Sequence, residues 1–192
     1  MDSPLPGFFV KFVGEPLKRG VRCFEQMMII DYNGSGFWSV DEVRARYAKY
    51  ARRFRITAPR DLSPLVHSNG DKQWIYSVMD RVIEGIEDGD PACAELGVEF
   101  IEEDRTFAFG RILKSNTARA LRRTPLTDEQ KERIRKRVVE MLGRQYLPRE
   151  YRQYAKLARK IGLGDWLHRI EEQSGNPWAK HYYTYLKEHA SH

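Results

Sequence analysis

The sequence predicts an all-α fold: a multi-helix domain with a helix–loop–helix unit near its N-terminus and a basic helical body behind it. Apolar residues recur at spacings of three and four through most of the 192 residues, while capping motifs and glycine stops mark helix ends. Clear strand signals are nearly absent. At this length we expect one domain, or two small ones, that buries about 70% of its unfolded surface.

Prolines and changes of composition divide the chain into three parts. Residues 1–16 form an N-terminal arm, in which three prolines break any helix. Residues 17–56 form the helix–loop–helix unit. Residues 57–192 form the helical body, which we expect to be continuous with that unit.

The loop of the N-terminal unit carries oxygen atoms at the spacing of a calcium site. Hard cations take six to eight oxygens, and a twelve-residue loop supplies them from its positions 1, 3, 5, 7, 9 and 12. Gly36 stands at the sixth position, where the sharp turn needs a positive φ that glycine adopts at least cost. The six ligand positions hold Asp31, Asn33, Ser35, the carbonyl of Phe37, Ser39 and Glu42.

This stretch resembles the EF-hand family, and the resemblance covers residues 17–54 only. Before the loop, Cys23, Met27 and Ile30 fall at helical spacing, which agrees with an incoming helix. The resemblance implies a calcium-binding regulatory or adaptor protein with calcium as its cofactor. The chain departs from the family at Trp38, where that family usually has Ile, Val or Leu. A bulky ring at this position disfavours the usual pairing with a second hand.

A plain capped turn is the alternative explanation of the same residues. Ser39 and Glu42 form a capping box at a helix start, and residues 33–36 contain ordinary turn dipeptides. Met27–Tyr32 and Phe37–Val40 can also form the two strands of a hairpin around that turn. On this interpretation the loop binds no cation.

Capping residues and apolar spacing place the remaining helices along the chain. Asp71 can cap a helix, Asp90-Pro91 is an N-cap followed by proline at the first helical position, and Thr127 opens a second capping box. Residues 107–114 are ambiguous. We expect helices at 43–54, 72–87, from 91 past 101, 115–123, 127–142, 148–161, 165–172 and 177–189.

Charge is distributed unevenly along the body, although the net charge of the whole chain is only +6. Residues 80–104 contain ten acidic residues and one arginine, whereas residues 105–160 contain 17 basic residues and five acidic ones. Opposite charges in adjacent segments predict that the two segments pack together in part. They also predict that some basic surface is left for an acidic partner.

The basic segment supplies the alternative functional site, a surface that binds nucleic acid or another acidic partner. Arginine grips phosphate with two parallel hydrogen bonds, so an arginine-rich helix face fits a phosphate backbone. The competing interpretation is that the acidic segment neutralises the same side chains. The candidate residues are Arg122, Arg123, Lys131, Arg133, Arg137, Arg152 and Arg159.

The sequence favours a binding role over catalysis. It contains no glycine-rich phosphate loop, nucleophile elbow or evident Cys–His pair, so no catalytic residue is proposed. Two cysteines, no secretory leader and no apolar stretch near the ~20 residues of a membrane span predict a soluble, cytoplasmic protein without a membrane partner. A protein partner, a second copy of the chain and nucleic acid all remain open.

Overall fold

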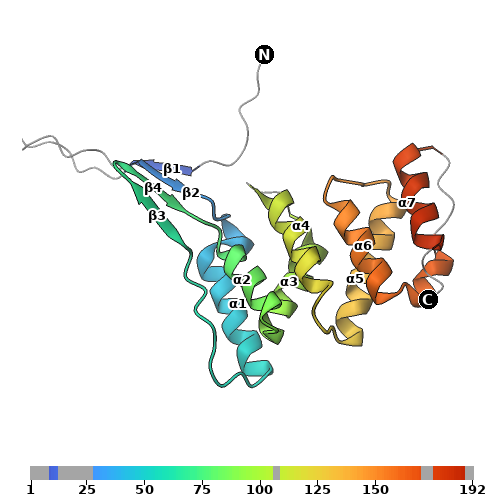
Figure 1. The fold of residues 1–192 in the computed structure, drawn as a ribbon, viewed down its shortest axis with the longest axis horizontal. Coiled ribbons are helices and arrows are strands. Elements are labelled where there is room, and N and C mark those ends of the chain that lie inside the picture. The colour runs from blue at the N-terminus through green and yellow to red at the C-terminus, as the bar shows by residue number, and fades with distance from the viewer. Residues whose placement is uncertain (1–8, 13–27, 106–108, 170–174, 189–192) are drawn as a thin grey trace, which may run out of the picture.

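The computed structural model describes residues 9–12, 28–105, 109–169 and 175–188 (Figure 1). The chain is mostly helical, as predicted, but a small sheet near the N-terminus corrects the all-α expectation. Expectations for Cys23, for Met27 and for most of the N-terminal arm concern residues outside the described ranges.

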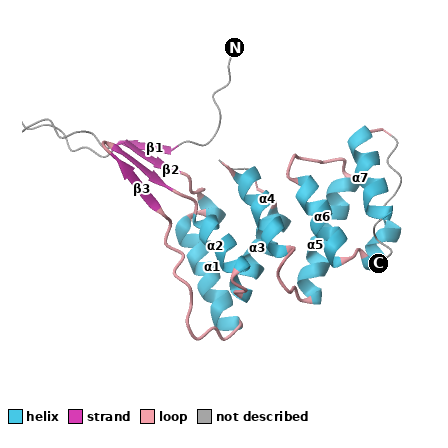
Figure 2. Ribbon diagram, viewed as in Figure 1, coloured by secondary structure: helices cyan, strands magenta, loops and turns pink. Residues whose placement is uncertain are grey.

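The sheet has four short strands in the order β1-β2-β4-β3. The outer pairs are antiparallel and the central pair, β2 with β4, is parallel. Figure 2 shows the strands together at one end of the molecule, beside the stacked helices. The strands are β1 (Phe9–Phe12), β2 (Met28–Asp31), β3 (Val66–Asn69) and β4 (Lys72–Ile75).

The expected helix from Lys72 begins later than predicted, because the chain first makes a hairpin. Gly70 has a φ of 58° and forms with Asp71 the two-residue connection between β3 and β4. The helix that follows, α2 (Val78–Glu87), is capped by Ser77 rather than by Asp71. The second strand of a short hairpin, β4, therefore lies where helical spacing predicted the first turns of the helix.

The segment before the predicted calcium loop is also a strand. Met28–Asp31 forms β2, which pairs with strands on both sides, so the expected incoming helix is wrong for these residues. The alternative hairpin is right in its first strand, because β2 lies within Met27–Tyr32, but wrong in its second. Residues 36–38 form a 3-10 turn, η1 (Gly36–Trp38), and Val40 begins a helix.

The other predicted helices are present with shifted ends. Asp90 accepts hydrogen bonds from two backbone N–H groups at the start of its helix, and Thr127 and Gln130 make the reciprocal bonds of a capping box. Asp165–Arg169, expected to be helical, lies in a 3-10 segment, η2 (Gly164–Arg169). The helices are α1 (Val40–Arg53), α3 (Pro91–Glu103), α4 (Gly110–Leu121), α5 (Asp128–Gly143), α6 (Tyr151–Ile161) and α7 (Pro177–Glu188).

The helices stack roughly in chain order along the long axis of the molecule (Figure 1). Helix α3 lies in the middle and contacts α1, α2, α4 and α5, while α6 packs on α4, α5 and α7. Phe100, Leu121 and Tyr154 are among the fully buried side chains of one continuous core. Within the described residues, no helix is both long and apolar enough to cross a membrane.

Candidate functional site

The predicted calcium loop joins β2 to α1, and its first two ligand residues hold that junction together. Asp31 Oδ1 accepts hydrogen bonds from the backbone N–H and the side-chain amide of Asn33, at 2.8 and 2.9 Å. Asn33 Oδ1 accepts from the backbone N–H of Val78 at 2.7 Å, and its amide also donates to the carbonyl of Tyr76 at 3.1 Å. Asn33 therefore fastens the loop to the start of α2.

The rest of the loop serves the start of α1. Ser39 caps α1 by accepting a hydrogen bond from the N–H of Glu42 at 3.4 Å, which is half of the predicted capping box. The N–H of Ser39 donates to the carbonyl of Gly36 at 3.0 Å and not to Glu42. Gly36 has the positive φ, 65°, that its position in the loop predicted. Ser35, Phe37 and Glu42 are exposed. No cluster of three or more His, Cys, Asp or Glu that could hold a metal occurs in the described ranges, and calcium binding stays a prediction.

Two of the predicted phosphate-binding arginines face acidic residues of the same chain. Arg133 pairs with Glu95 and Glu102 at 2.5 and 2.6 Å, and Arg137 pairs with Asp104 at 3.0 Å. These carboxylates belong to the acidic segment that was expected to compete for the basic one. Both arginines therefore join α5 to α3.

A buried ionic cluster lies at the C-terminal end of α3, where Arg137 meets Asp104. Asp104, whose side chain is 1% exposed, binds Lys114 Nζ at 2.6 Å and accepts from Arg137 and from the Tyr154 hydroxyl. Lys114, 3% exposed, also lies 3.5 Å from Glu150. Burial raises the pKa of Tyr154, so this hydroxyl keeps its proton. Two cations and two carboxylates balance one another here, which is the arrangement of a structural cluster.

The other predicted basic residues lie on separate elements. Arg123 and Lys131 are in surface pairs with Glu87 and Asp128, at 3.9 and 3.0 Å, and such pairs contribute little to stability. The remaining three belong to the C-terminal end of α4 and to α6, namely Arg122, Arg152 and Arg159.

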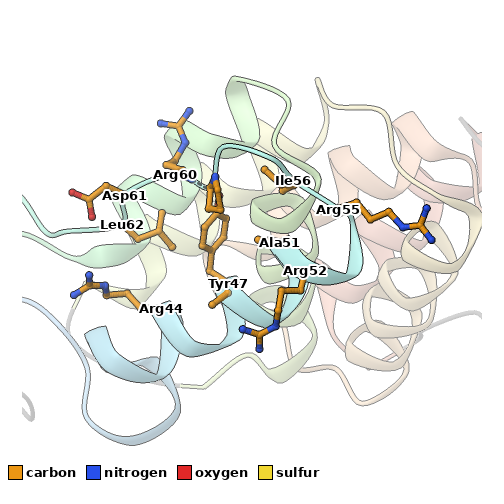
Figure 3. Close-up of a pocket in the computed structure, with 11 residues that line it drawn as sticks. Arg44, Tyr47, Ala51, Arg52, Arg55, Ile56, Arg60, Asp61 and Leu62 are labelled. Atoms are coloured by element: carbon orange, nitrogen blue, oxygen red, sulfur yellow. Dashed lines mark hydrogen bonds between the residues drawn. The ribbon is translucent and has the colours of Figure 1, made fainter.

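A pocket of about 370 Å³ beside α1 was not predicted from the sequence (Figure 3). One wall is a flank of α1, and the other is the connector at residues 54–65, which folds back along the helix. Figure 3 shows the four labelled arginines around Tyr47 and Ala51. Six residues form the apolar floor: Tyr47, Ala48, Ala51, Ile56, Pro59 and Leu62.

The end of α1 shapes one side of this pocket. The N–H of Ile56 donates to the carbonyl of Ala51 at 2.9 Å, and that of Arg55 donates to the carbonyl of Arg52 at 3.1 Å. These two bonds are those of a Schellman motif, which usually places glycine in the left-handed conformation. Here Arg55 occupies that position with a φ of 55°, at a cost of about 1 kcal/mol.

Tyr47 holds the connector against the helices. Its hydroxyl accepts a hydrogen bond from the backbone N–H of Arg60 and donates one to Asp90, each at 2.7 Å. Burial, together with the bond to Asp90, raises the pKa of Tyr47 to about 12. Because Asp90 also caps α3, the pocket wall is tied directly to the central helix.

The arginines of the pocket differ in their surroundings. Arg60 is held by an ion pair with Asp88. Arg44, Arg52 and Arg55 are exposed at the rim. In the part of the chain that the structure describes, Arg52 and Arg55 have neither a hydrogen-bond nor an ion-pair partner for their guanidinium groups.

The chemistry of the lining suits binding better than proton transfer. The hydrogen bonds from Ser63 lower the pKa of Asp61, the single carboxylate among the lining residues, while that of Tyr47 is raised. Neither group exchanges a proton near pH 7, where a general acid or base needs to titrate. The described lining holds no histidine, cysteine, serine or lysine.

A weak sequence signal for this pocket exists but is easily missed. Arg44, Ala48, Arg52 and Arg55 follow one another at i, i+4, i+8 and i+11, which places arginines and a small residue on one helix face. The connector that completes the pocket has no such pattern, and its position depends on the bond to Tyr47.

The chain was compared with models of protein families, with curated proteins and with solved structures, and no significant match was found in any of the three comparisons. The case for function therefore stands on the geometry described above.

Proposed function

We propose that the protein is a binding module that recognises an acidic partner at the pocket beside α1. One observation carries this proposal: an apolar floor lies next to Arg52 and Arg55, two exposed guanidinium groups without partners among the described residues. Arginine pairs with carboxylate or phosphate through two parallel hydrogen bonds, so such a rim attracts and orients an anionic group.

The backbone at Arg55 supports the proposal. Glycine would occupy the left-handed position at lower cost, yet an arginine stands there with its side chain at the rim. Residues held in unfavourable backbone conformations are concentrated at functional sites. Gln145 has the same conformation after α5, so the strain at Arg55 supports the proposal only together with the position of its side chain at the rim.

Retention on polyglutamate and on heparin at ~50 mM salt tests the proposal, because charge contacts are strongest at low ionic strength. The double variant Arg52→Glu/Arg55→Glu is expected to lose most of its retention. The matched variant Arg149→Glu/Arg152→Glu changes the net charge equally on exposed positions at the α6 end and is expected to keep it. Equal losses of retention in the two variants would contradict a binding site beside α1. A larger loss in Arg149→Glu/Arg152→Glu would instead place the binding site on the basic surface predicted from the sequence.

Calcium binding by the 31–42 loop is a separate prediction. Only Asp31 and Glu42 are charged among its side-chain ligands, so the expected dissociation constant is on the order of 10⁻⁵–10⁻³ M. Calorimetric titration with millimolar calcium tests it, and an absence of heat ends it. Because Asn33 bonds to Val78, Asn33→Ala is expected to cost about 1–2 kcal/mol of unfolding free energy with or without calcium.

A further inference from the structure

The floor of the pocket is a site for an apolar group. Of the floor residues, Tyr47, Ala51 and Leu62 are buried, while the half-buried Ile56 and the exposed Pro59 add apolar surface. At about 370 Å³ the pocket is near the lower end of the ~300–1,000 Å³ range of small-ligand sites. One bulky side chain fits this space, whereas a large ligand would lie mostly outside it.

The positive charges are at the rim and not on the floor. The guanidinium groups of Arg44, Arg52 and Arg55 are exposed, and the only polar side chain on the floor, the Tyr47 hydroxyl, is already bonded to Arg60 and Asp90. An anion inside the pocket would find no free donor there. The anionic groups of a ligand must therefore flank its apolar group.

The same features disfavour a nucleic acid as the occupant. Proteins that hold single strands offer exposed aromatic faces on which bases stack. Tyr47, the one aromatic residue of the lining, is 4% exposed and is fixed at its hydroxyl. A phosphate backbone would meet the rim arginines but leave the apolar floor empty.

We propose that the occupant is an acidic peptide segment that inserts one bulky apolar side chain between carboxylates. The apolar side chain packs on Leu62 and Ala51, and the flanking carboxylates pair with Arg52 and Arg55 on one side and with Arg44 on the other. This inference rests on the proposed function and specifies its partner class as a protein segment with acidic and apolar residues.

Fluorescence anisotropy with a set of short peptides tests this inference. Each peptide consists of aspartate and glutamate with one phenylalanine, placed at a different position in each member, and a matched set has alanine in its place. We expect the best phenylalanine peptide to bind about 10- to 100-fold more tightly than its alanine match, as burial of one aromatic side chain predicts. If no peptide binds, or if a single-stranded oligonucleotide or inorganic phosphate binds more tightly than every peptide, the inference is overturned.

A variant that fills the pocket separates the two proposals. Ala48 is exposed on α1 and lines the pocket, so Ala48→Leu narrows the pocket without disturbing the core or the helix. This variant is expected to remove the preference for phenylalanine over alanine, whereas Arg52→Glu/Arg55→Glu is expected to lose binding to both peptide sets. If the parent protein binds both peptide sets equally and still depends on Arg52 and Arg55, the inference fails and the proposed function stands. If binding does not depend on those arginines, both fail.

Discussion

The arginines of α5 and those beside α1 have the same side chain in opposite surroundings. Arg133 and Arg137 contact carboxylates at 2.5–3.0 Å and join two helices of the core. Arg52 and Arg55 extend into solvent next to an apolar pocket, with no partner in the described part of the chain. The position of the nearest carboxylate thus decides whether an arginine stabilises the fold or stays available to another molecule.

The largest loss of stability is expected at the buried ionic cluster around Asp104. Asp104→Ala leaves Lys114 and Arg137 without their shared carboxylate, and removal of one partner of a buried ionic cluster costs about 3–5 kcal/mol. Urea denaturation measures this loss. The control, Glu140→Ala, removes only a 4.0 Å pair with Lys136 and is expected to change the unfolding free energy by less than about 0.5 kcal/mol. Equal small changes would show that the ion pairs of Asp104 do not stabilise the protein.

Arg133→Gln removes one of the arginines that join α5 to α3. It removes the bonds to Glu95 and Glu102, and among the described residues the buried Glu95 then keeps only Gln130 as a partner. A loss of about 2 kcal/mol is therefore expected. Retention on polyglutamate is expected to remain as in the parent protein. Arg152→Gln, on the exposed side of α6, is the matched control for stability. If Arg133→Gln weakened polyglutamate binding while its stability stayed unchanged, Arg133 would serve binding and not the fold, which would contradict the comparison.

Arg55→Gly tests one of the two arginines beside α1 that have no partner among the described residues. Glycine relieves the left-handed backbone conformation, so the unfolding free energy is expected to rise by about 1 kcal/mol while retention on polyglutamate falls. A thermal melt and the salt concentration at elution measure the two effects on one variant. Arg144→Gly offers a control, because Arg144 ends α5 with a negative φ and has no left-handed strain to relieve. A gain in stability with unchanged binding would remove Arg55 from the site.

The smallest effect on stability is expected from Tyr47, in the pocket wall, at alkaline pH. The pKa of Tyr47 is raised from 10.0 to about 12, so its contribution to stability is complete below pH 10 and is lost as the pH rises toward 12. The stability difference between the parent protein and Tyr47→Phe is therefore expected to shrink over that interval. Denaturation at several pH values measures it, and a difference that stays constant to pH 12 would contradict the raised pKa of the buried Tyr47 hydroxyl.

Local signals predicted most helix ends, because capping is a matter of neighbouring residues. The box at Thr127 and the cap at Asp90 form as expected, and the helix predicted for residues 148–161 ends at residue 161, before Gly162. The β3–β4 hairpin was missed because its four-residue strands, exposed in β3 and mostly half-buried in β4, lack an alternating apolar pattern. Its Gly70-Asp71 turn was the available signal, since this dipeptide is typical of two-residue hairpins.

The candidate site was less predictable than the fold, because it depends on tertiary contacts. The dense basic run on α5 predicted a phosphate-binding surface, but helix packing turns Arg133 and Arg137 toward acidic residues. The pocket instead needs the 54–65 connector to fold back on α1 and to bond to Tyr47. No pattern within one segment encodes that contact.

The parallel pairing of β2 with β4 has a consequence for the order of folding. The two strands belong to segments separated by all of α1 and the connector, and parallel strands cannot pair until such a crossover has taken shape. The sheet is therefore expected to assemble after α1 has packed on α3, and to open before the helices do. In native-state hydrogen exchange, the amides of β2 and β4 are expected to exchange through a low-energy local opening, while those of α3 report the global unfolding of the chain.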